Sequence, residues 1–364
     1  MIFGLQPFFQ LKRRFKIDSF KNEMRPMQLK KLKILVSAFY IGFVLFSQKS
    51  NAQEVNFQVL DEVSGLPIEY VSINLLNGKG FYGDKNGIVI YDFENIDSLE
   101  ISHVSYISRT INTNEIADRL YLKPKDFALD EVILLSDKKK KQSEKEFEAP
   151  KINSFYDFGV YGGQIITKIA SPKPLDVVLE EITIPLVYDE IWMQVNGIKK
   201  LPNVIIRVDF HQVNDSLIQN PILESEYFVI TNKQIKNGKV DLKLKNNPII
   251  SSEGILFAVT FIGKADENGN LIFENPNYIS SIKGKNTIMT KYIPIQIPLV
   301  LETGPLKTFV GNVFSENPSF FKIAPRISVA GHLNPAERRT AYLEKLDQMP
   351  NYTFNFKFKY YFYE

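Results

Sequence analysis

The sequence predicts an all-β protein with two β-domains and one short helix near its C-terminus. Short runs of alternating apolar and polar residues recur along the chain and are separated by Asn- and Gly-containing turns, as in antiparallel sheets. A highly charged segment at residues 137–153 divides these runs into two groups. Convincing helical spacing occurs only at residues 335–348. The 364 residues are enough for two domains of ordinary size.

Residues 1–52 have the pattern of an export leader. A run of about 13 mostly apolar residues, Ile34 to Phe46, directly follows the basic cluster Lys30–Lys33, which is the layout of a signal peptide. We expect cleavage between Ala52 and Gln53. The alternative is a membrane anchor, but a spanning helix needs about 20 apolar residues. The mature chain is therefore expected to have no integral membrane span.

The start of the leader has more than one candidate, because Met24 and Met27 would each begin a leader of ordinary length. With any of these starts, the leader predicts an exported protein. The expected location is the periplasm or the outer membrane, as an associated protein, or the medium after secretion.

Removal of the leader changes the net charge of the chain. The whole sequence has 44 Lys and Arg against 41 Asp and Glu, a net charge of +3. Residues 1–52 hold 10 of the basic and 2 of the acidic residues, so 34 basic and 39 acidic residues remain, a net charge of −5. No nucleic-acid partner is therefore predicted. The sequence has no cysteine, which excludes disulfides, thiol catalysis and a lipid-modified N-terminal cysteine.

Residues 53–136 are predicted to form the first domain. Apolar residues occupy alternate positions in Val55–Leu60, and further strands are expected at Tyr70–Ile73, Ile88–Tyr91 and Leu99–Ser102. Turn dipeptides between these runs supply the positive φ angles that tight connections need. The length leaves room for a small sandwich.

Three parts of this domain resemble, in the same order, parts of the carboxypeptidase-like regulatory domain. Val59–Ile73 resembles its first two strands, and Gly80–Ile88 resembles its next hairpin. Leu120–Pro124 and the Leu-Asp-Glu-Val run in Leu129–Leu134 resemble the exit found where such domains stand at the N-terminus of exported bacterial proteins. The resemblance implies a transthyretin-like, Ig-type β-sandwich of about seven strands that serves as an accessory module. It identifies a fold and not a site.

The segment 137–153 is predicted to be a charged linker. It begins with Lys138–Lys141, continues with Gln, Ser, Glu and Lys, and has no apolar face. Such a run is too charged to bury. The alternative interpretation is a short solvated helix.

Residues 154–364 are predicted to form a larger β-domain. Its expected strands are Val177–Pro185, Val204–Val213, Tyr227–Thr231, Lys239–Leu244, Ile255–Ile262 and Tyr292–Leu301, with turns at Asn196-Gly197, Asn237-Gly238 and Asn268-Gly269. The short helix is expected at residues 335–348, because Asn334 suits its cap and Pro335 and Glu337 suit its first turn. Val204–Asn214, followed by Asn220–Leu223, resembles the second domain of exported bacterial proteins that carry the regulatory domain in front. That resemblance implies a jelly-roll-like sandwich whose function is generally unassigned.

The chain ends in a predicted strand with an almost wholly aromatic face. Alternate residues from Tyr352 to Phe362 are Tyr or Phe. Three interpretations stay open: a core strand of the sandwich, an edge that binds a partner, and an outer-membrane strand. The other strands lack the regular lipid-facing alternation of outer-membrane proteins, and the last residue, Glu364, is not aromatic.

No motif for catalysis is recognised. None of the three histidines, His103, His211 and His332, has a glutamate three positions later, as a zinc carboxypeptidase requires. We expect them at half-buried strand or loop positions. The chain also has no Gly-x-Ser-x-Gly sequence.

Glycoside hydrolysis needs only two carboxylates. Candidate members of such a pair are Glu180, Glu181, Asp189 and Glu190. Adjacent strand residues face opposite sides, so Glu180 and Glu181 are not expected to share a cleft.

Two groups of residues are candidates for binding. Tyr188, Asp189 and Trp192 mix aromatic and acidic side chains, as a sugar-binding platform does, and the alternative for Trp192 is core packing. Asp266, Asn268 and Asn270 place oxygen ligands around Gly269, as a calcium loop does. A plain hairpin turn needs the same residues. No other cofactor is predicted.

These features together predict a non-catalytic, exported cell-envelope protein in which a β-sandwich accessory domain precedes a module that binds a protein or a glycan. One alternative is a carbohydrate- or peptide-active hydrolase. Another is a truncated relative of TonB-dependent receptor components, which often begin with the regulatory domain, although about 210 further residues are too few for the receptor barrel.

Overall fold

The computed structural model describes residues 55–91, 96–125, 139–144, 157–188, 190–195, 197–212, 222–275, 277–282, 285–301, 308–314, 321–322, 352–354 and 356–363. These residues belong to one compact unit, 54–364. The predicted cleavage site at Ala52 and Gln53, the rest of the leader, and the predicted helix at 335–348 lie outside the described residues.

The prediction of an all-β fold is confirmed. The described residues form many strands in several sheets with a sandwich-like arrangement. The helical elements among them are the 3₁₀ turn η2 (Thr113–Glu115) and the six-residue helix α2 (Glu190–Val195). Within the described ranges, no helix has both the length and the apolar character needed to cross a membrane.

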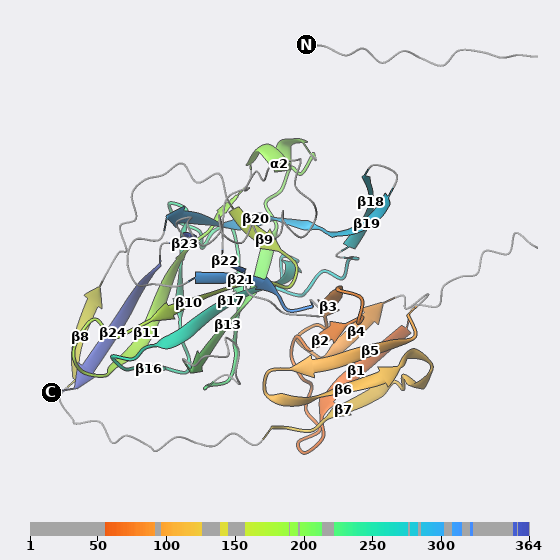
Figure 1. Ribbon diagram of the computed structural model, residues 1–364, viewed down its shortest axis with the longest axis horizontal. Helices are drawn as coiled ribbons and strands as arrows, with labels where there is room; N and C mark the ends of the chain where they lie inside the picture. Colours follow the sequence, from red (N-terminus) through yellow and green to blue (C-terminus); the bar gives the residue numbers. More distant parts are fainter. Residues whose placement is uncertain are drawn as a thin grey trace, which may run out of the picture. The chain divides into compact units, whose positions relative to one another are not determined.

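The first sandwich is built from seven strands: β1 (Val55–Asp61), β2 (Ser72–Asn74), β3 (Gly80–Tyr82), β4 (Ile88–Tyr91), β5 (Ser98–His103), β6 (Tyr106–Asn112) and β7 (Arg119–Leu122). One sheet has the order β4-β1-β7 and the other β3-β2-β5-β6 (Figure 1). Strand β1 is antiparallel to β4 and parallel to β7. Its core contains Phe57, Val59, Ile73, Leu99 and Leu122, all at most 1% exposed.

The turn between β3 and β4 has the Asp-to-Gly geometry that its sequence predicts. The Asp84 Oδ1 atom accepts hydrogen bonds from the backbone N–H groups of Asn86 and Ile88, at 2.8 Å each. Gly87 has a φ of +68°, and a Cβ there would lie 2.4 Å from the Val59 carbonyl oxygen. Only glycine fits both requirements.

The larger sandwich contains the remaining strands: β8 (Lys139–Glu144), β9 (Asp157–Val160), β10 (Gly163–Ile169), β11 (Val177–Pro185), β12 (Val187–Tyr188), β13 (Asn203–Gln212), β14 (Glu226–Ile230), β15 (Lys239–Lys243), β16 (Ile249–Ile250), β17 (Ile255–Ala265), β18 (Asn277–Ile282), β19 (Lys285–Thr290), β20 (Tyr292–Leu301), β21 (Thr308–Asn312), β22 (Phe321–Lys322), β23 (Tyr352–Phe354) and β24 (Lys357–Tyr363). A six-stranded sheet has the order β14-β13-β17-β10-β21-β22. A second sheet runs β15-β11-β24-β8, with β16 on β11, and a third runs β12-β20-β23, with β9 on β20. Strands β18 and β19 form a separate hairpin.

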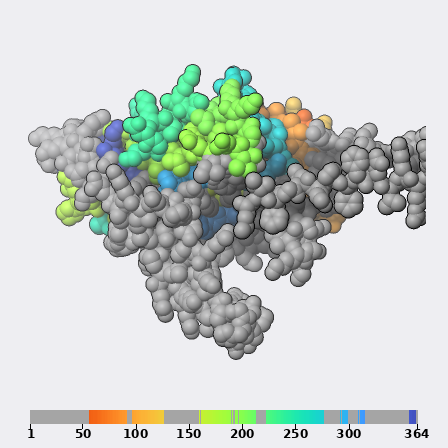
Figure 2. Space-filling model, turned by 90° about the horizontal axis from the view of Figure 1, so that it is seen from above, coloured from red at the N-terminus to blue at the C-terminus, as the bar shows by residue number. Residues whose placement is uncertain are grey.

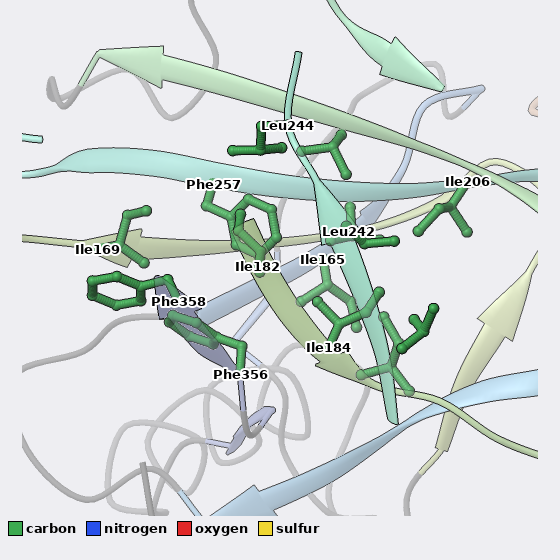
Figure 3. Close-up of a cluster of buried hydrophobic side chains, with 14 of the residues drawn as sticks. Ile165, Ile169, Ile182, Ile184, Ile206, Leu242, Leu244, Phe257, Phe356 and Phe358 are labelled. Carbon is green, nitrogen blue, oxygen red and sulfur yellow. The ribbon is translucent and has the colours of Figure 1, made fainter. Parts of the chain in front are cut away.

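The core of the larger sandwich lies between the six-stranded sheet and the sheet β15-β11-β24-β8. Ile165, Ile206 and Phe257 extend from the first sheet toward Ile182 and Phe358 of the second (Figure 3). Each of these five side chains is at most 4% exposed. Figure 2 shows part of the outer surface, where side chains from the middle of the chain, coloured green, are exposed.

The segment predicted as a charged linker contains a strand. Residues Lys139–Glu144 form β8, which pairs antiparallel with β24. The interpretation of this segment as a solvated helix is therefore wrong. A strand at the edge of a sheet needs only backbone hydrogen bonds, and lysines are common there because they prevent further pairing.

The C-terminal aromatic segment is a core strand, as one of the three interpretations proposed. Phe356, Phe358, Tyr360 and Phe362 all belong to the large core. Strand β24 pairs with β11 on one side and β8 on the other, so its interpretation as a partner-binding edge is wrong. The prediction of one continuous strand is also wrong, because β23 pairs instead with β20.

Candidate functional site

The two sandwiches meet at a small apolar cluster that neither sandwich forms alone. Tyr70 and Tyr82 of the first sandwich pack with Ile205, Ile262 and Phe314 of the larger one, and all five are at most 4% exposed. The Tyr82 and Phe314 ring centroids are 5.2 Å apart. A β-bulge in the pairing of β13 with β17, at Ile205, lies next to this contact. Bulges of this kind redirect side chains.

A close approach of two chain segments accompanies this contact. A Cβ atom on Gly80 of β3 would lie 2.1 Å from the Phe314 ring and 2.5 Å from the Ile73 carbonyl oxygen. No side chain fits there without displacing one of them. The resemblance to the regulatory domain placed Gly80 in a hairpin, and the structure adds that its missing side chain makes room for the larger sandwich.

A buried ion pair lies on the face of the six-stranded sheet that meets the first sandwich. Arg207 Nε donates to Asp209 Oδ2 at 2.8 Å, and the two side chains are 7% and 0% exposed. Ser225 Oγ donates to the other carboxylate oxygen of Asp209. Burial alone would lower the pKa of Arg207, but the adjacent Asp209 raises it above its usual value. The contact with Asp209 therefore offsets the cost of burying the Arg207 cation.

A histidine of the first sandwich contacts this polar group. His103 Nε2 lies 3.0 Å from Tyr227 Oη of β14, and Tyr227 stands opposite Arg207 in the pairing of β13 with β14. The Tyr70 and Tyr227 ring centroids are 4.6 Å apart. Burial and the nearby Arg207 cation lower the pKa of His103 to about 3. His103 is thus neutral at pH 7 and contributes to the junction as a hydrogen-bonding group.

The depressed pKa of His103 makes the junction sensitive to acid. The unfolded chain binds a proton at this histidine below a pH of about 6.5, and the folded protein does not. We therefore expect the free energy of unfolding to fall as the pH drops from about 6.5 toward 3, by at most about 1.4 kcal/mol per pH unit, because one histidine binds at most one proton. Urea unfolding at a series of pH values measures this slope.

The matched variant is His103→Gln, which keeps a hydrogen-bonding group near Tyr227 but does not titrate. Its profile between pH 4 and 6 should be flatter than that of the wild type. Two parallel profiles would show that the carboxylates, and not His103, cause the acid sensitivity.

Beside the junction lies a pocket of about 270 Å³ lined by both sandwiches. The first sandwich contributes Phe81, Tyr82, Ile90 and Tyr91, and the larger one contributes Tyr161, Ile262, Leu271, Ile272, Phe273, Glu274 and Asn275. The Phe81 and Tyr91 rings are stacked, with centroids 4.3 Å apart. The volume is near the lower end of the roughly 300–1,000 Å³ typical of small-molecule sites. A pocket of this size can hold a single sugar ring or a single side chain.

The polar groups of this junction pocket converge on one carboxylate. Glu274 accepts a hydrogen bond from Tyr161 Oη and pairs with Lys264 Nζ at 2.9 Å. Burial alone would raise the pKa of Glu274, but these two partners hold it below its usual value. Burial also raises the pKa of Tyr161. Glu274 is therefore a fixed anion, and Tyr161 is a neutral donor, at the side of an aromatic pocket.

The predicted sugar platform is described only in part. Tyr188 lies in β12, is half-buried, and packs against the large core. Burial raises its pKa to about 12. Asp189 and the side chain of Trp192 lie outside the described residues, although the backbone of Trp192 belongs to α2. The prediction of a platform at these residues stays untested.

The predicted calcium loop has the geometry of a hairpin turn. Asp266 Oδ1 accepts hydrogen bonds from the N–H groups of Asn268 and Asn270, at 2.8 Å each. The Asn270 side chain donates to the other Asp266 oxygen at 3.1 Å, and Gly269 has a φ of +82°. These bonds lower the pKa of Asp266. The carboxylate is thus already used by the turn, and the described residues contain no group of three acids or histidines that could hold a metal.

The other predicted chemistry-bearing residues that the structure describes lie at separate places in the fold. His103 lies at the junction, His211 is buried in β13 at 3% exposure, and His332 lies outside the described residues. The expected alternation at Glu180 and Glu181 is interrupted, because the pairing of β11 with β24 shifts register there. Glu181 is paired with Lys359.

Comparisons with protein-family models, with curated proteins and with solved structures find no match to this chain. The site must therefore be interpreted from its own residues. Sequence reasoning missed the junction pocket, because Tyr91, Tyr161 and Phe273 are far apart in the chain. The available signal was the Arg207-x-Asp209 pair among the apolar residues Val204 to Phe210, since a buried charge needs a partner.

Proposed function

We propose that this protein is a non-catalytic, exported cell-envelope protein that binds the terminal sugar of a glycan in the junction pocket. The observation that carries the proposal is a pocket with aromatic walls and one fixed carboxylate, built jointly by two docked sandwiches. Aromatic faces stack on the apolar faces of sugar rings, and carboxylate and phenol groups hydrogen-bond their hydroxyls. Sites at domain interfaces are a common location for such ligands.

The docking of the sandwiches supports this function. The His103–Tyr227 contact and the Gly80–Phe314 contact join the first sandwich to the larger one, so the two halves of the pocket are preorganised. Seven strands in two sheets support a regulatory-domain-like accessory module. Among the described residues that line the pocket, Glu274 is the only carboxylate, whereas glycoside hydrolysis by the usual route needs two. This favours binding over the hydrolase alternative.

Binding assays with the variant Phe273→Ala test the proposal. Wild-type protein, expressed without the leader, should bind at least one neutral oligosaccharide in an array, with affinity measured by calorimetry. Phe273→Ala should weaken that binding by roughly tenfold, because one stacked aromatic contributes about 0.5–1.5 kcal/mol beyond its buried area.

The control is Tyr121→Ala, which removes a 43% exposed aromatic side chain from β7 of the first sandwich. It should leave glycan affinity unchanged. The proposal fails if wild-type protein binds no glycan in the array, or if Tyr121→Ala reduces binding as much as Phe273→Ala.

A further inference from the structure

The outer face of the larger sandwich carries a groove of about 680 Å³ that is lined by lysines. The lysines are Lys233, Lys236, Lys239, Lys357 and Lys359, together called the lysine groove. Its other polar residues include Thr183, Gln234, Asn237 and Asp241. The described lining thus holds one acid and five lysines.

Strand alternation explains why these lysines gather on one face. In β15, Val240 and Leu242 enter the core, so Lys239 faces outward. In β24, Phe358 enters the core, so the lysines on either side of it face outward. Strand β11 lies between β15 and β24, and the loop after β14 adds two more lysines. Segments far apart in the sequence therefore build one basic surface.

The positive charge of the groove is only partly neutralised. Glu181 pairs with Lys359, and Asp241 accepts a hydrogen bond from Thr183 Oγ1 at 2.6 Å. Within the described part of the chain, no acidic residue forms an ion pair with Lys233, Lys236 or Lys357. The predicted mature chain is acidic overall, with a net charge of −5. A basic groove on an acidic protein is a local field that attracts an anionic ligand.

We propose that the lysine groove binds an acidic polysaccharide whose sugars carry carboxylates. Among the described residues that line the groove there is no aromatic side chain, so they give nucleic-acid bases no stacking surface. The only apolar residue in this described lining is Val240, which is buried and therefore offers no side chain for insertion into a membrane. Lysines supply point charges for carboxylates, and Thr183, Gln234 and Asn237 supply hydrogen bonds for sugar hydroxyls. This site is separate from the junction pocket, and the inference does not depend on the proposed function.

The experiment measures the affinity of leaderless protein for polygalacturonate, with neutral dextran and poly-glutamate as comparison ligands. The test variant combines Lys233→Gln, Lys236→Gln and Lys357→Gln. Each exposed pair contributes up to about fivefold in affinity, so the triple variant should lose roughly tenfold. Wild-type binding should weaken as salt increases.

The control variant combines Lys85→Gln, Lys123→Gln and Lys199→Gln, which change the net charge equally at exposed positions outside the groove. It should keep wild-type affinity, and so should Phe273→Ala, which tests the junction pocket. The proposal is overturned if polygalacturonate does not bind, if both triple variants lose affinity equally, or if dextran binds as tightly. Equal binding of poly-glutamate would also overturn it, in favour of an acidic peptide partner.

Discussion

Replacing Arg207 with methionine should lower the free energy of unfolding by about 3–5 kcal/mol. The methionine fills much of the same space but leaves the Asp209 carboxylate without a counterion at 0% exposure. An unpaired buried charge is among the most destabilising changes in a folded protein, because the protein must either hold the charge away from water or protonate it. Urea unfolding at pH 7 measures the loss.

The matched control is the double variant Arg207→Met with Asp209→Leu. Since it removes both charges, it should recover most of the lost stability. This pattern would show that the pair is needed because each charge neutralises the other. Two results contradict this account: a loss below about 1 kcal/mol for Arg207→Met, or a double variant that is as unstable as the sum of the two single changes.

The strands of the larger sandwich could be predicted from the sequence where one face is buried and the ends carry clear turns. Strand β11 has the predicted bounds, Val177–Pro185. The turn at Asn237-Gly238 forms with positive φ at both residues, 52° and 71°. Alternation and turn residues are local signals, so a single sequence contains them.

Strands that lack these signals were missed. Strand β10 is buried at six of its seven positions, so it shows no alternation that would distinguish it from other apolar runs. Strand β8 consists of lysine and other polar residues, and its pairing with β24 depends on backbone groups that carry no sequence signature. The junction was missed for a related reason: Gly80 and Phe314 each look ordinary in the sequence until the fold brings them into contact.

A second substitution with a large expected effect on stability lies in the C-terminal strand β24, which is part of the core. Replacing Phe358 with alanine should cost about 3–5 kcal/mol of unfolding free energy. Phe358 is 4% exposed, stands opposite Ile182 of β11, and has ring contacts with Phe356 and Tyr360 at 6.2 and 5.9 Å. Its removal leaves a cavity in the core beside a strand that is paired on both sides, where neighbouring side chains have little freedom to fill it.

The neighbouring variant Lys357→Ala tests the alternation directly. Lys357 lies one position away on the same strand, but its side chain faces the lysine groove, so its replacement should change stability by no more than about 0.5 kcal/mol. Equal losses from the two variants would mean that β24 does not alternate between core and solvent. A large loss from Phe358→Ala alone would show that this single strand both completes the core and orients the lysines of the groove, because each inward aromatic residue fixes the outward direction of the next.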